Sequence, residues 1–227
     1  MKVDVIIPAY NEEASIGSVI RDIPSGLVRE VIVCNNASTD NTAEVAKAHA
    51  ATVVMAPKRG YGSACLAGMA HIASKTDPPD VVVFLDGDYS DHPEEITLLL
   101  DPIRNEGQEL VIGSRALGDL QKGSMQPQQI FGNWLATTLI RLLYNYKFTD
   151  LGPFRSVTYD ALKKIDMQDQ DFGWTVEMQV KAAKMGLLCK EVPVSYRKRI
   201  GVSKVSGTIK GTILAGHKIL WTIFRLL

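Results

Sequence analysis

Two carboxylates stand at the end of a strongly apolar segment. Residues 81–85 are all apolar, and Asp86, Gly87 and Asp88 follow them directly. Hard oxygen ligands two residues apart on a flexible turn suit Mg²⁺ or Mn²⁺, with water and substrate phosphates as further ligands. A divalent cation would also relieve the repulsion between the two acids. The alternative is a plain turn, since Asp-Gly is common in turns.

The acids that follow have a structural explanation of their own. Pro93 suits the first position of a helix, and Glu94 and Glu95 suit its positively polarised beginning. We extend this explanation to Asp91. Asp86 and Asp88 are left as the candidate metal ligands.

The surrounding pattern predicts how these acids are positioned. Short apolar runs at 3–7, 31–34, 52–55, 81–85 and 110–112 alternate with segments of helical spacing. Strands that are nearly all apolar are typical of a parallel sheet covered on both faces. The pattern therefore predicts a doubly wound α/β fold, in which ligands bind beyond the carboxyl ends of the strands. Residues 117–129 are predicted to form a long polar loop of functional importance.

Composition narrows the class of protein. The 227 residues, 46% hydrophobic and 22% charged, suit one large globular domain. A net charge of zero argues against a nucleic-acid partner. Cys34, Cys65 and Cys189 lack metal-binding spacing and are predicted to be reduced thiols of a cytosolic protein. We expect no signal peptide, because a strand begins almost at once, and no transmembrane helix, because no uninterrupted apolar segment reaches about 18 residues.

Eight short motifs occur in an order that resembles a known enzyme family. They read IIPAYNEE, NNASTDNT, RGYGSA, FLDGDYSDHPEEI, VIGSR, TDLGPFR, WTVEMQVKA and RKRIGVSK. Over essentially the whole chain they resemble the family 2 glycosyltransferases of GT-A fold, closest to the dolichol-phosphate (polyprenol-phosphate) mannose or glucose synthase group. The resemblance implies a mostly parallel GT-A domain over 1–205, with helices on both faces. It would consist of a nucleotide-sugar half to about 115 and an acceptor half from 116, followed by an amphipathic helix over 206–227.

The resemblance also implies a donor site at the carboxyl edge of the sheet. Asp86 and Asp88 would hold Mg²⁺ or Mn²⁺ and the diphosphate, with Ser90 as a third metal ligand where the family often has Gln. The nucleotide-sugar would be bound by Pro8, Ala9, Tyr10, Glu12, Asn35, Asn36, Gly60, Gly62, Asp86, Gly87, Arg199 and Lys204. For Gly60 and Gly62 the alternative is a purely structural role in the loop that starts a helix. One of the two asparagines stands where the family usually has Asp, which leaves UDP- and GDP-hexose donors both open. Arg197, Arg199 and Lys204 would close over the diphosphate, unless they are only a solvated run of charge.

The reaction implied by the resemblance is a single inverting displacement at the anomeric carbon. Asp88 would act with the cation on the departing diphosphate, and Arg115, at the end of a strand, would face a phosphate. Arg155 would contact the acceptor phosphate or pair with Asp150. A lipid phosphate is already ionised, whereas a hydroxyl acceptor needs a general base, for which Asp150 and Glu177 are the candidates.

Two apolar segments bear on the acceptor. Residues 134–146 and 206–227 each combine a wide apolar face with cations and Trp, a pattern of helices that lie in a membrane interface. The alternative is a helix packed on the core, and the last helix could equally contact a second copy of the chain. We expect an enzyme peripheral to the cytoplasmic, inner face of a membrane, acting on a polyprenyl phosphate.

Other functions stay open at this point. The same donor site could serve a hydroxyl of a lipid or polysaccharide, since TDLGPFR departs from the DPTSGFR pattern of the mannose synthases. The chain could also be a non-catalytic module that binds a sugar nucleotide or a membrane. A nicotinamide-binding protein is disfavoured, because the first strand leads into Pro-Ala-Tyr-Asn-Glu and not GxGxxG.

Overall fold

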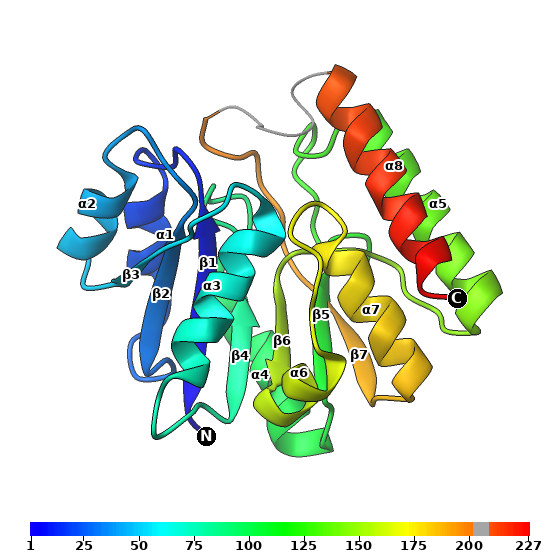
Figure 1. Cartoon of the computed structure of the whole chain (residues 1–227), viewed down its shortest axis with the longest axis horizontal. Helices are drawn as coiled ribbons and strands as arrows, with labels where there is room; N and C mark the ends of the chain where they lie inside the picture. The colour runs from blue at the N-terminus through cyan, green and yellow to red at the C-terminus, as the bar shows by residue number, and fades with distance from the viewer. Residues whose placement is uncertain (202–208) are drawn as a thin grey trace.

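The protein folds around one seven-stranded sheet (Figure 1). The computed structural model describes residues 1–201 and 209–227, with the backbone alone for 209–213. The strands are β1 (Val3–Ala9), β2 (Glu30–Asn35), β3 (Thr52–Met55), β4 (Val81–Phe84), β5 (Leu110–Ser114), β6 (Arg155–Thr158) and β7 (Cys189–Pro193). Their order across the sheet is β3-β2-β1-β4-β6-β5-β7. All five strands expected from the apolar runs are present.

The sheet is mostly parallel, as predicted, with one exception. β1 pairs in parallel with β2 and β4, and β5 pairs in parallel with β7. β6 lies between β4 and β5 and is antiparallel to both. The carboxyl ends of β1, β2, β4 and β5 therefore face the same edge of the sheet, and the chain segments that follow them can meet there.

Helices cover both faces of the sheet because alternate strand residues point to opposite sides. Ile6 belongs to one core cluster, with residues of α3 and α7, and its neighbours Val5 and Ile7 belong to the other, with residues of α1 and α4. A 3₁₀ turn (Pro93–Glu95) precedes α4. The helices are α1 (Ile16–Asp22), α2 (Thr42–Ala48), α3 (Tyr61–Ala73), α4 (Ile96–Glu106), α5 (Pro127–Tyr144), α6 (Tyr159–Ile165), α7 (Trp174–Met185) and α8 (Ile209–Arg225).

α5 is longer than the sequence indicated. It begins at Pro127, inside the predicted loop, because a reciprocal capping box between Gln126 and Gln129 closes its first turn. α8 lies alongside α5 and is tied to it by the Tyr144 hydroxyl, which donates to the Ile223 carbonyl (Figure 1). None of the described helices is both long and apolar enough to cross a bilayer.

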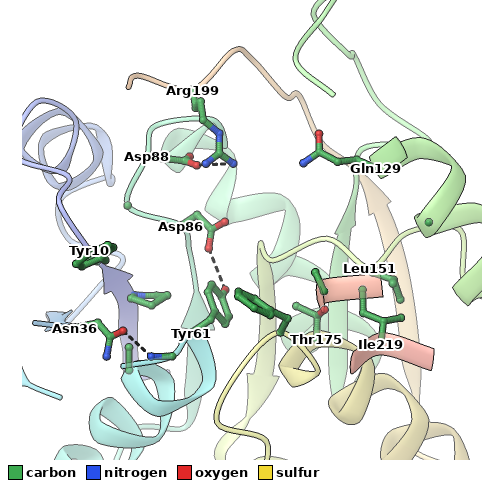
Figure 2. A pocket seen from close by; sticks show the side chains of 18 of the residues that line it. Tyr10, Asn36, Tyr61, Asp86, Asp88, Gln129, Leu151, Thr175, Arg199 and Ile219 are labelled. Atoms are coloured by element: carbon green, nitrogen blue, oxygen red, sulfur yellow. Dashed lines mark hydrogen bonds and ion pairs between the residues drawn. The ribbon is translucent and has the colours of Figure 1, made fainter. Parts of the chain in front are cut away.

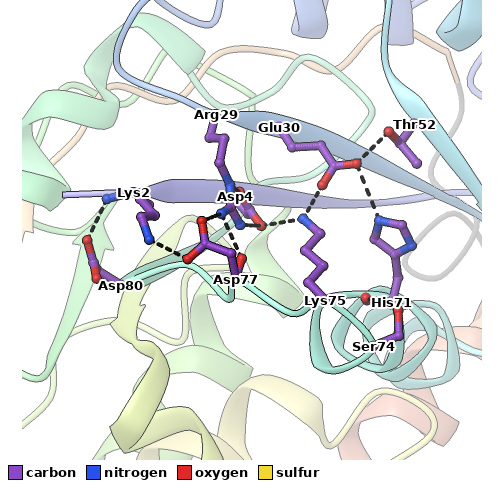
Figure 3. A network of polar contacts seen from close by, with 10 residues as sticks. All are labelled: Lys2, Asp4, Arg29, Glu30, Thr52, His71, Ser74, Lys75, Asp77 and Asp80. Carbon is purple, nitrogen blue, oxygen red and sulfur yellow. Dashed lines mark hydrogen bonds and ion pairs between the residues drawn. The ribbon is translucent and has the colours of Figure 1, made fainter.

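A charged network fixes the amino-terminal ends of β1 and β2 (Figure 3). Asp4 is fully buried, and its Oδ2 lies 2.7 Å from Arg29 Nη2 and 2.6 Å from Lys75 Nζ. Glu30 also pairs with Lys75, and its Oε1 accepts from the Thr52 hydroxyl at 2.6 Å. These charges lie at the end of the strands that is opposite to the expected ligand site, and their partners give them a structural role.

Candidate active site

A cavity of about 650 Å³ opens at the carboxyl edge of the sheet (Figure 2). Its lining includes most of the predicted nucleotide-sugar residues: Pro8, Ala9, Tyr10, Glu12, Asn36, Gly60, Asp86, Gly87 and Arg199. The predicted metal ligand Asp88 and the predicted phosphate contact Arg115 line it as well. Its other wall comes from α5, through residues that include Gln129 and Asn133, and from α8, through residues that include Gly216 and Ile219. One cavity thus joins the acidic turn to α5 and α8.

The acidic turn after β4 is held in a defined conformation. Ser90 donates to Asp88 Oδ1 through its hydroxyl at 2.5 Å and through its backbone N–H at 2.9 Å. Tyr89 has a positive φ of 63°, a conformation that a non-glycine residue adopts only where the surroundings enforce it. Ser90 is buried outside the cavity lining, and the contacts seen here orient Asp88. The role of Ser90 as a third metal ligand stays a prediction.

A segment after β7 places Arg199 over this turn. The Arg197 N–H donates to the Ser90 carbonyl, and the Ile200 N–H donates to the Asp88 carbonyl, both at 2.9 Å. Arg199 Nη2 then lies 3.0 Å from Asp88 Oδ2, as Figure 2 shows. The Arg197 guanidinium instead stacks on the Tyr89 ring and donates to the Tyr89 and Asp91 carbonyls. Arg199 thus faces the cavity beside Asp88, whereas Arg197 holds the turn.

Tyr61, at the start of α3, contacts the other acid. Its hydroxyl donates to Asp86 Oδ1 at 3.0 Å (Figure 2). Burial and the adjacent Asp88 carboxylate raise the pKa of Asp86 to about 7, although the Tyr61 hydrogen bond opposes the rise. We did not predict Tyr61 from sequence, although it stands between two of the predicted glycines.

Asp86 and Asp88 provide a chemically suitable place for a divalent cation, although the described residues hold no cluster of three acidic, His or Cys ligands. Asp86 and Asp88 offer hard oxygens to the cavity. Behind them, neither carboxylate oxygen of buried Asp91 has a hydrogen-bond partner in the described part of the chain. Burial and the two neighbouring acids raise the pKa of Asp91 well above its ordinary value. A bound cation would offset this accumulation of negative charge, and the donor set fits Mg²⁺ or Mn²⁺.

The sequence of the chain matches one protein family over most of its length. The family model for glycosyl transferase family 2 matches residues 4–166. The chain belongs to glycosyl transferase family 2. An uncharacterized glycosyltransferase of Mycobacterium tuberculosis is 36% identical over 218 residues, which are 94% of each chain. Undecaprenyl-phosphate mannosyltransferase of Micrococcus luteus is 30% identical over 93% of this chain and 90% of that protein.

Solved structures place this family 2 glycosyltransferase in the GT-A fold, as predicted. Glucosyl-3-phosphoglycerate synthase of Mycobacterium tuberculosis, crystallised with Mn²⁺, UDP and phosphoglyceric acid, superposes with a TM-score of 0.80. The two sequences are 23% identical, and the match covers 99% of this chain and 78% of the other. The protein is therefore a transferase with a GT-A fold.

The acids predicted as general bases of this transferase are engaged elsewhere. Both Asp150 oxygens accept from the Arg115 guanidinium at 2.7 Å, and one also accepts from the Arg115 N–H at 2.8 Å. Glu177 is fully buried, lies 2.7 Å from Lys181 Nζ, and accepts from the backbone N–H groups of Gln168 and Asp169. Neither acid lines the cavity. These contacts give both acids a positioning role, in which Asp150 holds Arg115 and Glu177 holds the loop before α7, and the base role stays a prediction.

Arg155 does not lie where an acceptor phosphate could reach it. It is completely buried, and its guanidinium donates to the carbonyls of Gly152 and Thr175 and to Gln179 Oε1. Burial lowers its pKa to about 10. The predicted acceptor contact and the predicted pairing with Asp150 are therefore both wrong, because the guanidinium instead satisfies buried carbonyls below the cavity.

Two more nucleotide-binding predictions need correction. Asn35 points away from the cavity, and its side chain bonds to Met55 Sδ and to the Ser38 N–H, because adjacent residues at a strand end point in opposite directions. Gly62 faces protein and not ligand, since a Cβ there would lie 2.0 Å from the Asp169 carbonyl. Gly60 does line the cavity, with φ +139°. Lys204 lies outside the described residues.

Proposed function

We propose that this family 2 glycosyltransferase moves a hexose from a UDP- or GDP-sugar to a polyprenyl phosphate at a membrane surface, with inversion at the anomeric carbon. The observation that carries the proposal is the single cavity, which has acids and Arg199 at one end and α5 and α8 at the other. The first end suits a diphosphate with a divalent cation, and the second suits a lipid.

On the donor side, different residues would bind the cation, stabilise the diphosphate and orient the two acids. Asp86 and Asp88 would hold Mg²⁺ or Mn²⁺, which would supply positive charge to the departing diphosphate. Arg199 lies within reach of the same charge, and Ser90 and Tyr61 orient the two acids. Asn36 would support the backbone beneath the nucleotide and would not hydrogen-bond to the base, because its amide already bonds the Gly60 N–H and the Lys58 carbonyl.

On the acceptor side, the contacts of two acids favour a phosphate. A hydroxyl needs a base that removes its proton, whereas a phosphate monoester carries its negative charge at neutral pH. Neither Asp150 nor Glu177 lines the cavity, and both are occupied by cations and backbone N–H groups. Asp150 holds Arg115 at the cavity wall, where a guanidinium suits an acceptor phosphate. The phosphate oxygen would attack the anomeric carbon as the bond to the diphosphate breaks.

The outer surfaces of α5 and α8 support the membrane part of the proposal. Phe131 and Trp134 on α5 are 59% and 58% exposed, and Trp221 and Phe224 on α8 are 43% and 52% exposed. Neither helix contains an acidic residue, and each carries at least one cation. Aromatic residues with cations and without acids suit a surface of anionic lipid. The relative from Micrococcus luteus, whose name includes undecaprenyl phosphate, agrees with this acceptor class.

Product analysis tests the proposal. The protein is incubated with Mn²⁺, radiolabelled UDP- or GDP-hexose, and vesicles that contain polyprenyl phosphate. We expect a lipid-extractable product whose label is released by mild acid, and none from Asp88→Asn. A product stable to mild acid would favour a hydroxyl acceptor. Nucleotide binding without transfer to any acceptor, phosphoglycerate included, would favour a non-catalytic module.

A further inference from the structure

A loop of residues 168–173 lies against the beginning of α3. The Ser63 N–H donates to the Gln170 carbonyl at 2.9 Å, and the Gly62 N–H donates to the Asp171 carbonyl at 3.3 Å. Lys58 Nζ also donates to Gln170 Oε1 at 2.7 Å. The loop therefore satisfies the first N–H groups of the helix whose first residue, Tyr61, contacts Asp86.

Asp169 organises this loop. Its Oδ1 accepts from the N–H groups of Asp171 at 2.8 Å and Gly173 at 3.1 Å, and its own N–H donates to Glu177. The Asp169 side chain is only 3% exposed. A carboxylate that is buried this deeply requires a compensating cation.

That cation comes from α8. Lys218 Nζ lies 2.9 Å from Asp169 Oδ2. The loop and the helix also touch closely at Gly173, where an added Cβ would lie 2.5 Å from Thr222 Oγ1. Ile219, next to Lys218, lines the cavity from the same helix. α8 thus contacts both the cavity and the loop under the donor site.

We propose that the Lys218–Asp169 ion pair is a positioning latch, through which α8 holds the 168–173 loop, and with it Tyr61 and Asp86, in the geometry that binds the nucleotide diphosphate and its cation. Lys218 touches neither Tyr61 nor Asp86, so its effect is exerted through the loop. The inference rests on the proposed donor function of the cavity. It makes donor affinity depend on the seating of a helix that also carries the exposed aromatic surface.

Nucleotide binding by purified variants tests the latch. Dissociation constants for UDP and GDP, each with Mn²⁺, are measured by calorimetry for the wild type and for Lys218→Met, Lys218→Gln and Lys218→Arg. Lys190→Met is the control. Lys190 Nζ lies 2.7 Å from Glu106 Oε1, close to the 2.9 Å of the Lys218–Asp169 pair, and neither Lys190 nor Glu106 lines the cavity. Thermal unfolding without nucleotide is measured for every variant, and a variant that does not fold is replaced by the other neutral one.

We expect the neutral Lys218 variants to bind the preferred nucleotide about three- to tenfold more weakly. Lys218→Arg should restore most of the affinity, and Lys190→Met should bind like the wild type even if its unfolding temperature falls. Wild-type affinity in folded Lys218→Met and Lys218→Gln would overturn the latch while leaving the donor site intact. A wild type that binds neither nucleotide would overturn the proposed function itself, and the latch with it.

Discussion

Arg199 Nη2 and Asp88 Oδ2 lie 3.0 Å apart at the edge of the cavity. The two residues are 111 positions apart in sequence. A backbone hydrogen bond from the Ile200 N–H to the Asp88 carbonyl holds the two chain segments together next to this ion pair. Burial opposes the charge of Arg199, but Asp88 keeps the arginine's pKa raised. A permanent cation beside a candidate metal ligand is suited to the charge that develops on a departing diphosphate.

Replacing Arg199 with Gln should therefore lower kcat for sugar transfer by about 10²–10³-fold, because one charged contact to the leaving group is lost. Arg199→Lys should retain part of the rate. Lys198→Gln is the matched control, since Lys198 is exposed and its described hydrogen bond is made by the backbone N–H. Steady-state kinetics measure all three, and equal rates for Arg199→Gln and Lys198→Gln would remove Arg199 from the reaction.

Tyr61→Phe should weaken the dependence on metal without unfolding the protein. The hydroxyl donates to the Asp86 carboxylate and favours its charged form, so its loss should raise the pKa of Asp86 further. At neutral pH we expect the Mn²⁺ concentration that gives half-maximal activity to rise about tenfold, because one hydrogen bond to a charged group is lost. A Mn²⁺ titration of activity measures it. Tyr146→Phe removes a hydroxyl that donates to the Cys189 carbonyl and does not line the cavity, and should leave the Mn²⁺ titration unchanged.

Acidification should release the metal, and protonation of Asp86 should contribute stability to the metal-free protein. The pKa of Asp86 is raised from its ordinary value of 3.8 to about 7 by burial and by Asp88. The folded state therefore binds more protons than the unfolded state between about pH 4 and 7, so this group costs stability as pH rises through that range. A cation competes with the same proton. Without metal, this contribution should vanish in Asp86→Asn; urea unfolding at pH 5 and 7.5 measures it.

The same ionisation gives a binding prediction. Mn²⁺ affinity in the presence of nucleoside diphosphate should fall as the pH drops below about 7, because Asp86 is then increasingly protonated. Calorimetric titrations between pH 5.5 and 8 measure the affinity. An affinity that does not change with pH would show that Asp86 is ionised throughout this range and that its surroundings do not raise its pKa.

Arg155→Lys should reduce stability although the charge is kept. The planar guanidinium bonds the Gly152 and Thr175 carbonyls together, and a single ammonium cannot reproduce this fork. We expect a loss of about 1–3 kcal/mol in the free energy of unfolding, the cost of buried acceptors left without donors. Urea denaturation measures it against Arg104→Lys on the exposed surface of α4, where Arg104 pairs with Asp101. Equal stabilities would contradict the buried role.

Much of the fold and the acidic site followed from local pattern. Continuous apolar runs predicted β1 to β5, and the carboxyl-end rule placed Asp86 and Asp88 at the cavity. β6 (Arg155–Thr158) and β7 (Cys189–Pro193) were missed because they are short and mix polar with apolar residues, so their pairing depends on neighbours distant in sequence. The antiparallel insertion of β6 follows from that same pairing.

Errors at the site came from side-chain direction. Motif position could not decide between Asn35 and Asn36, because one step along a strand reverses the direction of the side chain. Glu177 was placed correctly on a helix, but helical spacing did not show that a loop would cover it. Tyr61 was hidden because its partner, Asp86, is 25 residues away and the contact exists only in the folded sheet.

The central claim is that Asp86 and Asp88 bind a divalent cation together with the donor's diphosphate. Calorimetric titration of UDP and GDP, with and without Mn²⁺, into the wild type and Asp88→Asn tests it most directly. We predict that one nucleotide binds the wild type at least tenfold more tightly with Mn²⁺ than without it, about 1.4 kcal/mol, and that Asp88→Asn abolishes the difference. Equal affinities with and without Mn²⁺, or a metal effect that survives in Asp88→Asn, would contradict the account.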